Sequence, residues 1–243
     1  MSNDVFKFKR FSISHAKSTM RVGTDGVLLG AWAVSDVDNA CQSFRVLDIG
    51  CGCGLIAIMM AQRFSFSQVH GVDIDEPSIE EARYNAINSP FSGRLSFSCM
   101  DIRNFAAEKS LQRAFDFILC NPPYYTEHTL PPDERRSRAR NVAHLSFEGL
   151  IKSVKMLLAE DGKFSVVLPM QSKAFFVDEA LKVELYVTRE CVVRTTCFKS
   201  PKRVLLEFGN KPNEKIVLES LVLQYSDGKR SAEYSLLCQD FYL

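Results

Sequence analysis

Residues 46–55 read Val46-Leu47-Asp48-Ile49-Gly50-Cys51-Gly52-Cys53-Gly54-Leu55, and they are the most informative segment of the chain about its fold. Residues 45–49 are predicted to form a short buried strand, the three glycines a tight turn, and residues 55–64 a helix. A strand that leads through a glycine turn into a helix N-terminus presents backbone N–H groups and allows a ligand to approach the backbone closely. The stretch therefore predicts a nucleotide-binding platform in an α/β domain.

The spacing of the glycines separates two kinds of nucleotide-binding turn. A dinucleotide fingerprint requires a third small residue at position 55, which is Leu55 here. The pattern is instead Asp-x-Gly-x-Gly-x-Gly from Asp48, and a carboxylate at the strand end repels a pyrophosphate and attracts a cation. This pattern resembles the first motif of class I methyltransferases, whose cofactor S-adenosylmethionine carries an ammonium and a sulfonium group but no phosphate. A tight turn without a ligand is the alternative reading.

Composition bounds the class of protein. The chain has 243 residues, with 30 Lys and Arg against 29 Asp and Glu, so any nucleic-acid site must come from local clusters of charge. The eight cysteines contain no C-x-x-C pair, so neither a metal site nor a disulfide framework is predicted. The N-terminus lacks the apolar core of a signal peptide, and no apolar run is long enough for a membrane span. We expect a cytoplasmic protein without metal.

Two further acidic residues are candidate cofactor ligands. Asp73 ends a predicted strand over residues 68–73, where a carboxylate can accept hydrogen bonds from both hydroxyls of a ribose. The helix that follows, residues 77–88, is expected to be scaffold only. Asp101 and Ile102 follow the third predicted strand, and resemblance to methyltransferases implies that Asp101 accepts from the adenine amino group while Ile102 packs on the ring. Taken alone, Asp101 is more typical of a helix or turn cap.

The fourth predicted strand, residues 115–120, leads into Asn121-Pro122-Pro123-Tyr124. The lone pair of an exocyclic amine or an amide is delocalised and is a poor nucleophile. The side-chain oxygen of Asn121 and the backbone carbonyl of Pro122 can localise that lone pair toward a methyl donor, and the prolines keep the carbonyl aimed. Tyr124 offers a ring on which a planar acceptor can stack. A Pro-Pro turn that merely ends a strand is the alternative reading.

Basic residues form two candidate substrate contacts. Residues 134–141 carry Arg135, Arg136, Arg138 and Arg140 directly after this motif, and arginine binds phosphate through its forked donors. A solvated loop is the alternative for this run. Residues 195–203 form a second basic loop, which contains Lys199 and Lys202.

Nearly the whole chain resembles the bacterial tRNA1(Val) (adenine-37) amino-methyltransferase family. The resemblance rests on residues 20–32, 48–54, 121–125 and 135–146 and on the terminal Glu233-Tyr234 and Asp240-Phe241-Tyr242. It implies an α/β Rossmann-like class I methyltransferase fold, with a seven-stranded, mostly parallel sheet and helices on both faces. It also implies S-adenosylmethionine as cofactor, a tRNA anticodon-loop adenine as methyl acceptor, and a substrate role for Tyr124 and Tyr125.

The chain is divided into three parts of one methyltransferase domain. Residues 1–44 are an N-terminal arm and helix, residues 45–210 the catalytic core, and residues 211–243 a C-terminal strand extension. In the arm, Thr24 or Asp25 is expected to cap a helix, and the Gly-Thr-Asp-Gly loop of residues 23–26 either touches the ligand or only packs. In the extension, residues 225–229 are a predicted hairpin turn. We expect a monomer.

Three rival functions remain open. A protein-glutamine methyltransferase uses the same four-residue motif on a side-chain amide, but about forty residues precede the first strand, which leaves little room for a helical recognition domain. A noncatalytic RNA-binding module would not need Asn121 and Tyr124. A nicotinamide oxidoreductase is disfavoured by Asp48 and Leu55.

Overall fold

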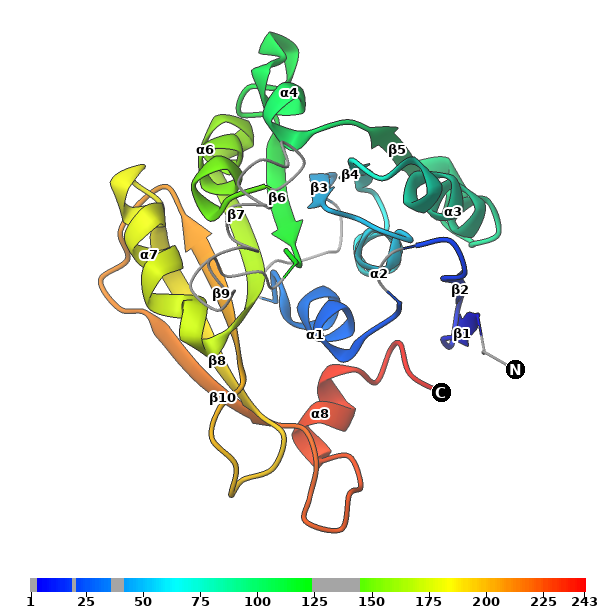
Figure 1. Cartoon of the computed structure of the whole chain (residues 1–243), viewed down its shortest axis with the longest axis vertical. Coiled ribbons are helices and arrows are strands. Elements are labelled where there is room, and N and C mark those ends of the chain that lie inside the picture. The colour runs from blue at the N-terminus through cyan, green and yellow to red at the C-terminus, as the bar shows by residue number, and fades with distance from the viewer. Residues whose placement is uncertain (1–3, 19–20, 36–41, 124–144) are drawn as a thin grey trace, which may run out of the picture.

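The computed structural model describes residues 4–18, 21–35, 42–123 and 145–243, and its centre is an eight-stranded sheet (Figure 1). From one edge to the other the strands are β10 (Val217–Val222), β8 (Tyr186–Arg194), β9 (Arg203–Gly209), β7 (Leu158–Pro169), β6 (Phe115–Cys120), β3 (Arg45–Ile49), β4 (Gln68–Asp73) and β5 (Leu95–Cys99). Strand β9 runs antiparallel to both of its neighbours, and all other pairs are parallel. The carboxyl ends of the parallel strands therefore lie along one edge, where ligands bind in such folds.

Helices cover both faces of the sheet, because consecutive residues of a strand point to opposite faces. Val46 packs in one core and Leu47 in the other. The first core is covered by α1 (Thr24–Trp32), α2 (Leu55–Arg63), α3 (Glu76–Ile87) and the short α8 (Ala232–Leu237). The second core is covered by α4 (Ile102–Ala107), α6 (Phe147–Leu157) and α7 (Lys173–Lys182). Short 3-10 helices occupy Ser92–Arg94, Lys109–Leu111 and Met170–Ser172. This arrangement confirms the predicted class I fold.

The sheet has eight strands, and the prediction of seven was short by the edge strand β10. This strand pairs in parallel with β8 and buries only Leu221 fully. Its place is fixed by Glu219, which accepts a hydrogen bond of 2.6 Å from Trp32 Nε1 and forms an ion pair of 3.2 Å with Arg189. The guanidinium of Arg189 lies 3.9 Å from the centre of the Trp32 ring. These contacts join residues far apart in the chain, so the local pattern of residues 217–222 did not reveal them.

The C-terminal segment differs from the predicted strand extension after β10. The hairpin turn of residues 225–229 is present: Tyr225 N donates to Lys229 O at 2.9 Å, and Gly228 has a positive φ of 83°. Residues 232–237 then form helix α8 rather than a strand, because Ser231 caps it by accepting from Tyr234 N at 3.0 Å. Within the described parts of the chain, no helix is both long and apolar enough to cross a membrane.

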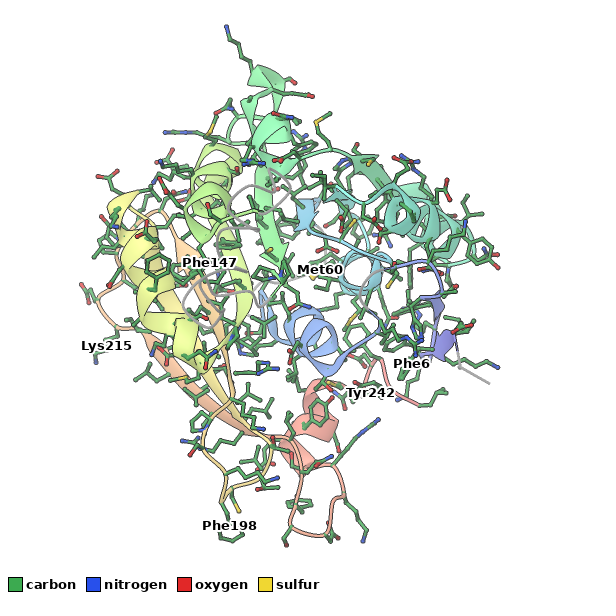
Figure 2. All side chains as sticks on the ribbon, viewed as in Figure 1. Phe6, Met60, Phe147, Phe198, Lys215 and Tyr242 are labelled. Atoms are coloured by element: carbon green, nitrogen blue, oxygen red, sulfur yellow. The ribbon has the colours of Figure 1, made fainter. Side chains whose placement is uncertain are left out.

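The N-terminal arm forms a small antiparallel hairpin of β1 (Val5–Lys7) and β2 (Ser12–Ser14). Its aromatic side meets the C-terminal tail: the rings of Phe8 and Tyr242 stack with centres 6.0 Å apart, and Figure 2 shows Phe6 in the same region as Tyr242. Helix α1 begins without a side-chain cap, with Gly23 at the N-cap. The expected cap by Thr24 or Asp25 is therefore wrong, and Asp25 instead pairs with Arg203 at 2.8 Å.

Candidate active site

The glycine turn between β3 and α2 has one closely packed glycine and two that face open space. Gly50, Gly52 and Gly54 all have positive φ, at 68°, 51° and 82°. A Cβ at Gly54 would lie 3.2 Å from Ala82 and the Phe97 ring, so this position needs glycine for packing as well as for conformation. A Cβ at Gly50 or Gly52 would meet no protein atom within 4 Å. The open side of the turn therefore leaves room for a ligand against the backbone.

Asp73 lies at the end of β4 and braces this turn. Its Oδ2 accepts from Gly52 N at 2.8 Å, and its Oδ1 accepts from Asp75 N at 3.0 Å. The residue is half-buried. A carboxylate has about four acceptor positions, so two remain for ligand hydroxyls. The predicted ribose role of Asp73 fits this geometry. Asp75, two residues later, caps α3 by accepting from Ser78 N at 3.0 Å.

Asp48 lies too deep in the protein to contact a ligand directly. Its side chain is fully buried, Oδ2 accepts from Ala57 N at 3.0 Å, and Oδ1 has no hydrogen-bond partner within the described residues. Burial raises the pKa of Asp48 to about 7, helped by the charge of Asp73 and opposed by the Ala57 N–H. Asp48 therefore acts on the first turn of α2 and, through it, on the shape of the glycine turn. Its predicted attraction to a cationic cofactor stays a prediction.

Asp101 and Ile102 follow β5, and both have partners of their own. Asp101 caps α4 by accepting from Arg103 N at 2.8 Å and also binds the Arg103 guanidinium, which holds the pKa of this carboxyl below its usual value. Ile102 is 5% exposed and packs in the second core. Little of its surface remains for a ligand ring, so its predicted role stays a prediction.

Ile74 is an alternative apolar contact that was not predicted from the sequence. Ile74 directly follows Asp73 at the end of β4 and is 52% exposed. A large apolar residue exposed beside a half-buried carboxylate is a natural surface for a planar ring. The signal in the sequence is an apolar residue immediately after the acidic strand end, and the resemblance to methyltransferases pointed to Ile102 instead.

Asn121 and the glycine turn lie at neighbouring strand ends. Ile49 of β3 pairs with Cys120 of β6, and neighbouring strands are about 4.8 Å apart, so the residues that follow, Gly50 and Asn121, lie side by side. Asn121 is half-buried and Pro122 is buried. The predicted roles of Tyr124, Tyr125, Arg135, Arg136, Arg138 and Arg140 concern positions outside the described residues. Lys199 and Lys202 are exposed in the β8–β9 loop.

Helix α3 is more than the scaffold that the sequence predicted, because its polar side chains bind the N-terminal arm. Asn85 donates to Cys53 O of the glycine turn at 2.9 Å and to Ser14 O at 2.8 Å. Glu81 is 4% exposed and accepts from the N–H groups of Ala16 at 2.8 Å and Ser18 at 2.8 Å. The arm is therefore fixed to the glycine turn through α3.

The cysteines of the site are apolar filler. Cys51, Cys53 and Cys120 are buried free thiols, and burial raises the pKa of Cys53 to about 12. The described residues hold no cluster of His, Cys, Asp and Glu able to bind a metal ion.

The chain matches known proteins over its full length. Residues 30–195 match the family model of the methyltransferase small domain. A tRNA1(Val) (adenine(37)-N6)-methyltransferase of Phocaeicola vulgatus is 40% identical over 100% of this chain and 99% of its own length. The chain belongs to the tRNA1(Val) (adenine(37)-N6)-methyltransferase family. The protein of the same name from Flavobacterium psychrophilum is 39% identical over 98% of this chain and 99% of its own.

A solved structure supports the fold assignment of this family member. The predicted O-methyltransferase Atu636 of Agrobacterium tumefaciens has a TM-score of 0.69 at 17% identity and covers 89% of this chain and 96% of its own. At this level of identity the likeness shows the fold alone. Membership of the tRNA1(Val) methyltransferase family therefore rests on the sequence relatives. The geometry of the site in this chain rests on the strand ends described above.

Proposed function

We propose that this chain transfers a methyl group from S-adenosylmethionine to the 6-amino group of an adenine in tRNA, at adenine 37 of a valine tRNA as in the names of its relatives. The observation that carries the proposal is the position of Asn121 beside the open glycine turn, at the paired ends of β6 and β3. A methyl donor bound at the glycine turn and an amino group bound by Asn121 would be next to each other, as methyl transfer requires.

The residues at the carboxyl ends of β3, β4 and β5 fit the cofactor. The open sides of Gly50 and Gly52 admit a ligand against the backbone, and Asp73 has spare acceptor capacity for ribose hydroxyls. We assign the adenine ring of the cofactor to the surface formed by Ile74 and the start of α4, with Asp101 at the edge of that surface. When bound, S-adenosylmethionine supplies an activated methyl group on its sulfonium.

Asn121 and Pro122 activate the acceptor nitrogen. The Asn121 side-chain oxygen and the Pro122 carbonyl accept the two amino hydrogens, which draws the nitrogen lone pair out of the ring and toward the donor. Pro122 is buried, so its carbonyl is held by the packing around β6. The proton leaves after transfer, from a nitrogen that has become an acidic ammonium, so the step needs no side-chain base.

The substrate adenine has to leave its base stack to enter the site, while the phosphates of the RNA around it need positively charged contacts. An anticodon-loop adenine is single-stranded, which makes its extrusion into a pocket inexpensive. The exposed Lys199 and Lys202 lie at the carboxyl end of β8, on the same edge of the sheet as Asn121, and suit phosphate contacts. The roles of Tyr124, Tyr125 and the Arg135–Arg140 run rest on sequence. A tRNA substrate also favours the predicted cytoplasmic location, and we retain the prediction of a monomer.

Methylation of total RNA and total protein from a strain that lacks this gene tests the proposal. The purified chain and isotopically labelled S-adenosylmethionine are added to both fractions, and nucleosides and peptides are analysed by mass spectrometry. We expect label in 6-methyladenosine from tRNA. Label in methylglutamine instead would favour the protein-glutamine methyltransferase, and cofactor binding without any label would favour the noncatalytic module.

A further inference from the structure

Two loops lie side by side at the carboxyl end of the edge strands. The β8–β9 loop spans residues 195–202, and the loop after β10 spans residues 223–231. Backbone hydrogen bonds of 2.9 Å join them, from Leu223 N to Arg194 O and from Gln224 N to Thr195 O. Figure 1 shows both loops at the lower edge of the view. Because β8 and β10 run parallel to β6, the loops lie on the same edge of the sheet as Asn121.

Together the loops present aromatic rings among cations. Phe198 is 88% exposed, and Figure 2 shows it at the end of its loop, pointing away from the protein. Tyr225 on the neighbouring loop is 49% exposed. Lys199 and Lys202 form no salt bridge within the described part of the chain. We define the edge-loop surface by these residues and two neighbouring arginines: Arg194, Phe198, Lys199, Lys202, Tyr225 and Arg230.

The surface carries positive charge that nearby acids do not cancel. Two carboxylates near it have cationic partners already, since Asp25 pairs with Arg203 at 2.8 Å and Asp227 with Lys229 at 3.2 Å. A single exposed apolar residue is ordinary on a protein surface. Phe198 differs because Lys199 and Lys202 lie on the same loop and because this loop is at the ligand-binding edge of the sheet.

We propose that the edge-loop surface is a second RNA contact, in which Phe198 stacks on an unpaired base while Lys199 and Lys202 bind the adjoining phosphates. Rings that stack on bases and cations that bind phosphates are the two components of single-strand recognition. A paired base offers no free face, so the nucleotide concerned is unpaired. The proposal rests on the proposed function, because it takes RNA to be the substrate.

The contacted nucleotide is not the one that is methylated. Strands β6 and β8 are three positions apart in the sheet, and at about 4.8 Å for each step their ends are about 14 Å apart. The surface therefore affects binding of the RNA and leaves the chemical step at Asn121 unchanged.

Kinetics with an unmodified tRNA1(Val) transcript test the proposal. Phe198→Ala is expected to raise the KM for RNA roughly 5- to 100-fold, with kcat at saturating RNA and the affinity for S-adenosylmethionine unchanged. Phe198→Trp keeps a stacking ring and is expected to restore the KM. The matched control is Phe66→Ala, because Phe66 is 58% exposed but precedes β4 at the opposite edge of the sheet.

The dependence of RNA binding on salt tests the lysines separately. Replacing Lys199 and Lys202 together with Gln is expected to reduce the slope of log affinity against log salt by about 1.4, as for the loss of two single-strand phosphate contacts. The control is the double change of Lys109 and Lys215 to Gln, since both are exposed and precede strands at the opposite edge. The control is expected to keep the wild-type slope.

The outcomes separate this inference from the proposed function. If the wild-type protein does not methylate the transcript, the proposed function itself fails. If it does, and Phe198→Ala behaves like Phe66→Ala while the two lysine pairs share one slope, the second RNA contact is contradicted. If Phe198→Ala instead abolishes a self-association measured by light scattering and leaves the KM unchanged, the surface is a contact between copies of this chain.

Discussion

The cofactor half of the candidate active site and the proposed substrate half, which extends to the edge-loop surface, are built in different ways. On the cofactor half, side chains are tied to backbone: Asp73 to Gly52, Asp48 to Ala57, and Asn85 to Cys53. On the substrate half, Phe198 and Lys199 extend from an exposed loop. A small cofactor that must place one methyl group needs a preorganised pocket. A polyanion such as RNA is bound by charged side chains that extend to its phosphates. Changes in the first half should therefore alter geometry and stability, and changes in the second should alter RNA binding.

Asn121, which lies between the two halves, is expected to give the largest effect. Asn121→Ala removes an acceptor that acts on the nitrogen only as the methyl group is transferred, so single-turnover methylation is expected to fall about 100-fold or more. Affinity for S-adenosylmethionine, measured by calorimetry, is expected to stay within about threefold of wild type. Asn213→Ala, at an exposed position before β10, serves as the control. Unchanged turnover would remove Asn121 from the mechanism.

Asp73 and Asp75 form a matched pair on the cofactor half. Asp73→Ala loses the brace on Gly52 and the acceptors for the ribose, and we expect cofactor affinity to fall about 10- to 100-fold. Asp75→Ala loses the cap of α3 and the hydrogen bond from Ser78 Oγ, so it should lower the free energy of unfolding by about 1 kcal/mol and leave the affinity unchanged. Calorimetry and thermal unfolding measure the two effects. Equal cofactor affinity in both variants contradicts the ribose assignment.

Glu81 and Glu80 are neighbours that differ in burial and test the anchoring of the arm. Glu81→Gln weakens several hydrogen bonds from residues 14–18, and we expect a loss of about 1–3 kcal/mol in the free energy of unfolding, with faster amide exchange in those residues. Glu80 makes an exposed ion pair with Lys17, so Glu80→Gln is expected to change stability by less than about 0.5 kcal/mol. Similar losses in both variants would show that the arm is not held by Glu81.

Asp48 gives the smallest effect and one that depends on pH. In the unfolded chain this group ionises near 3.8, and in the folded protein its pKa is raised to about 7. Between these values the folded state holds a proton that the unfolded state lacks, so stability falls as pH rises through this window and is level above it. Asp48→Asn should remove this slope, so that its free energy of unfolding gains about 2 kcal/mol relative to wild type as the pH rises from 4.5 to 6. The control is Asp161→Asn, at an exposed position, which should keep the wild-type slope. If Asp48→Asn also keeps that slope, the Asp48 carboxyl is already ionised at pH 5 and its raised pKa is contradicted.

Much of the core could be read from the sequence because its strands are buried on both faces. The predicted strands over residues 45–49, 68–73 and 115–120 match β3, β4 and β6. Each is a short apolar run that ends at a glycine turn, an acidic residue or the Asn-Pro motif, and such boundaries are local. Strand β7 begins at Leu158, which pairs with Phe115 in a register separate from that of the rest of the strand.

Contacts between distant residues could not be read in the same way. Asn85 looks like any polar residue on an amphipathic helix, and its bond to Ser14 spans 71 positions of the chain. The same holds for Glu219, which fixes β10 by contacts with Trp32 and Arg189. Asp48 was predicted as a strand-end carboxylate that attracts a cationic ligand, and only the packing of α2 over it shows that the side chain is buried.

Methylation of two purified transcripts can show whether adenine 37 is the methyl acceptor. One is unmodified tRNA1(Val), and the other carries guanine in place of adenine 37; both are incubated with the protein and labelled S-adenosylmethionine, digested, and mapped by mass spectrometry. The account predicts one 6-methyladenine at position 37 of the first transcript and no label in the second. Label of equal amount in both transcripts, or label in neither, would contradict it.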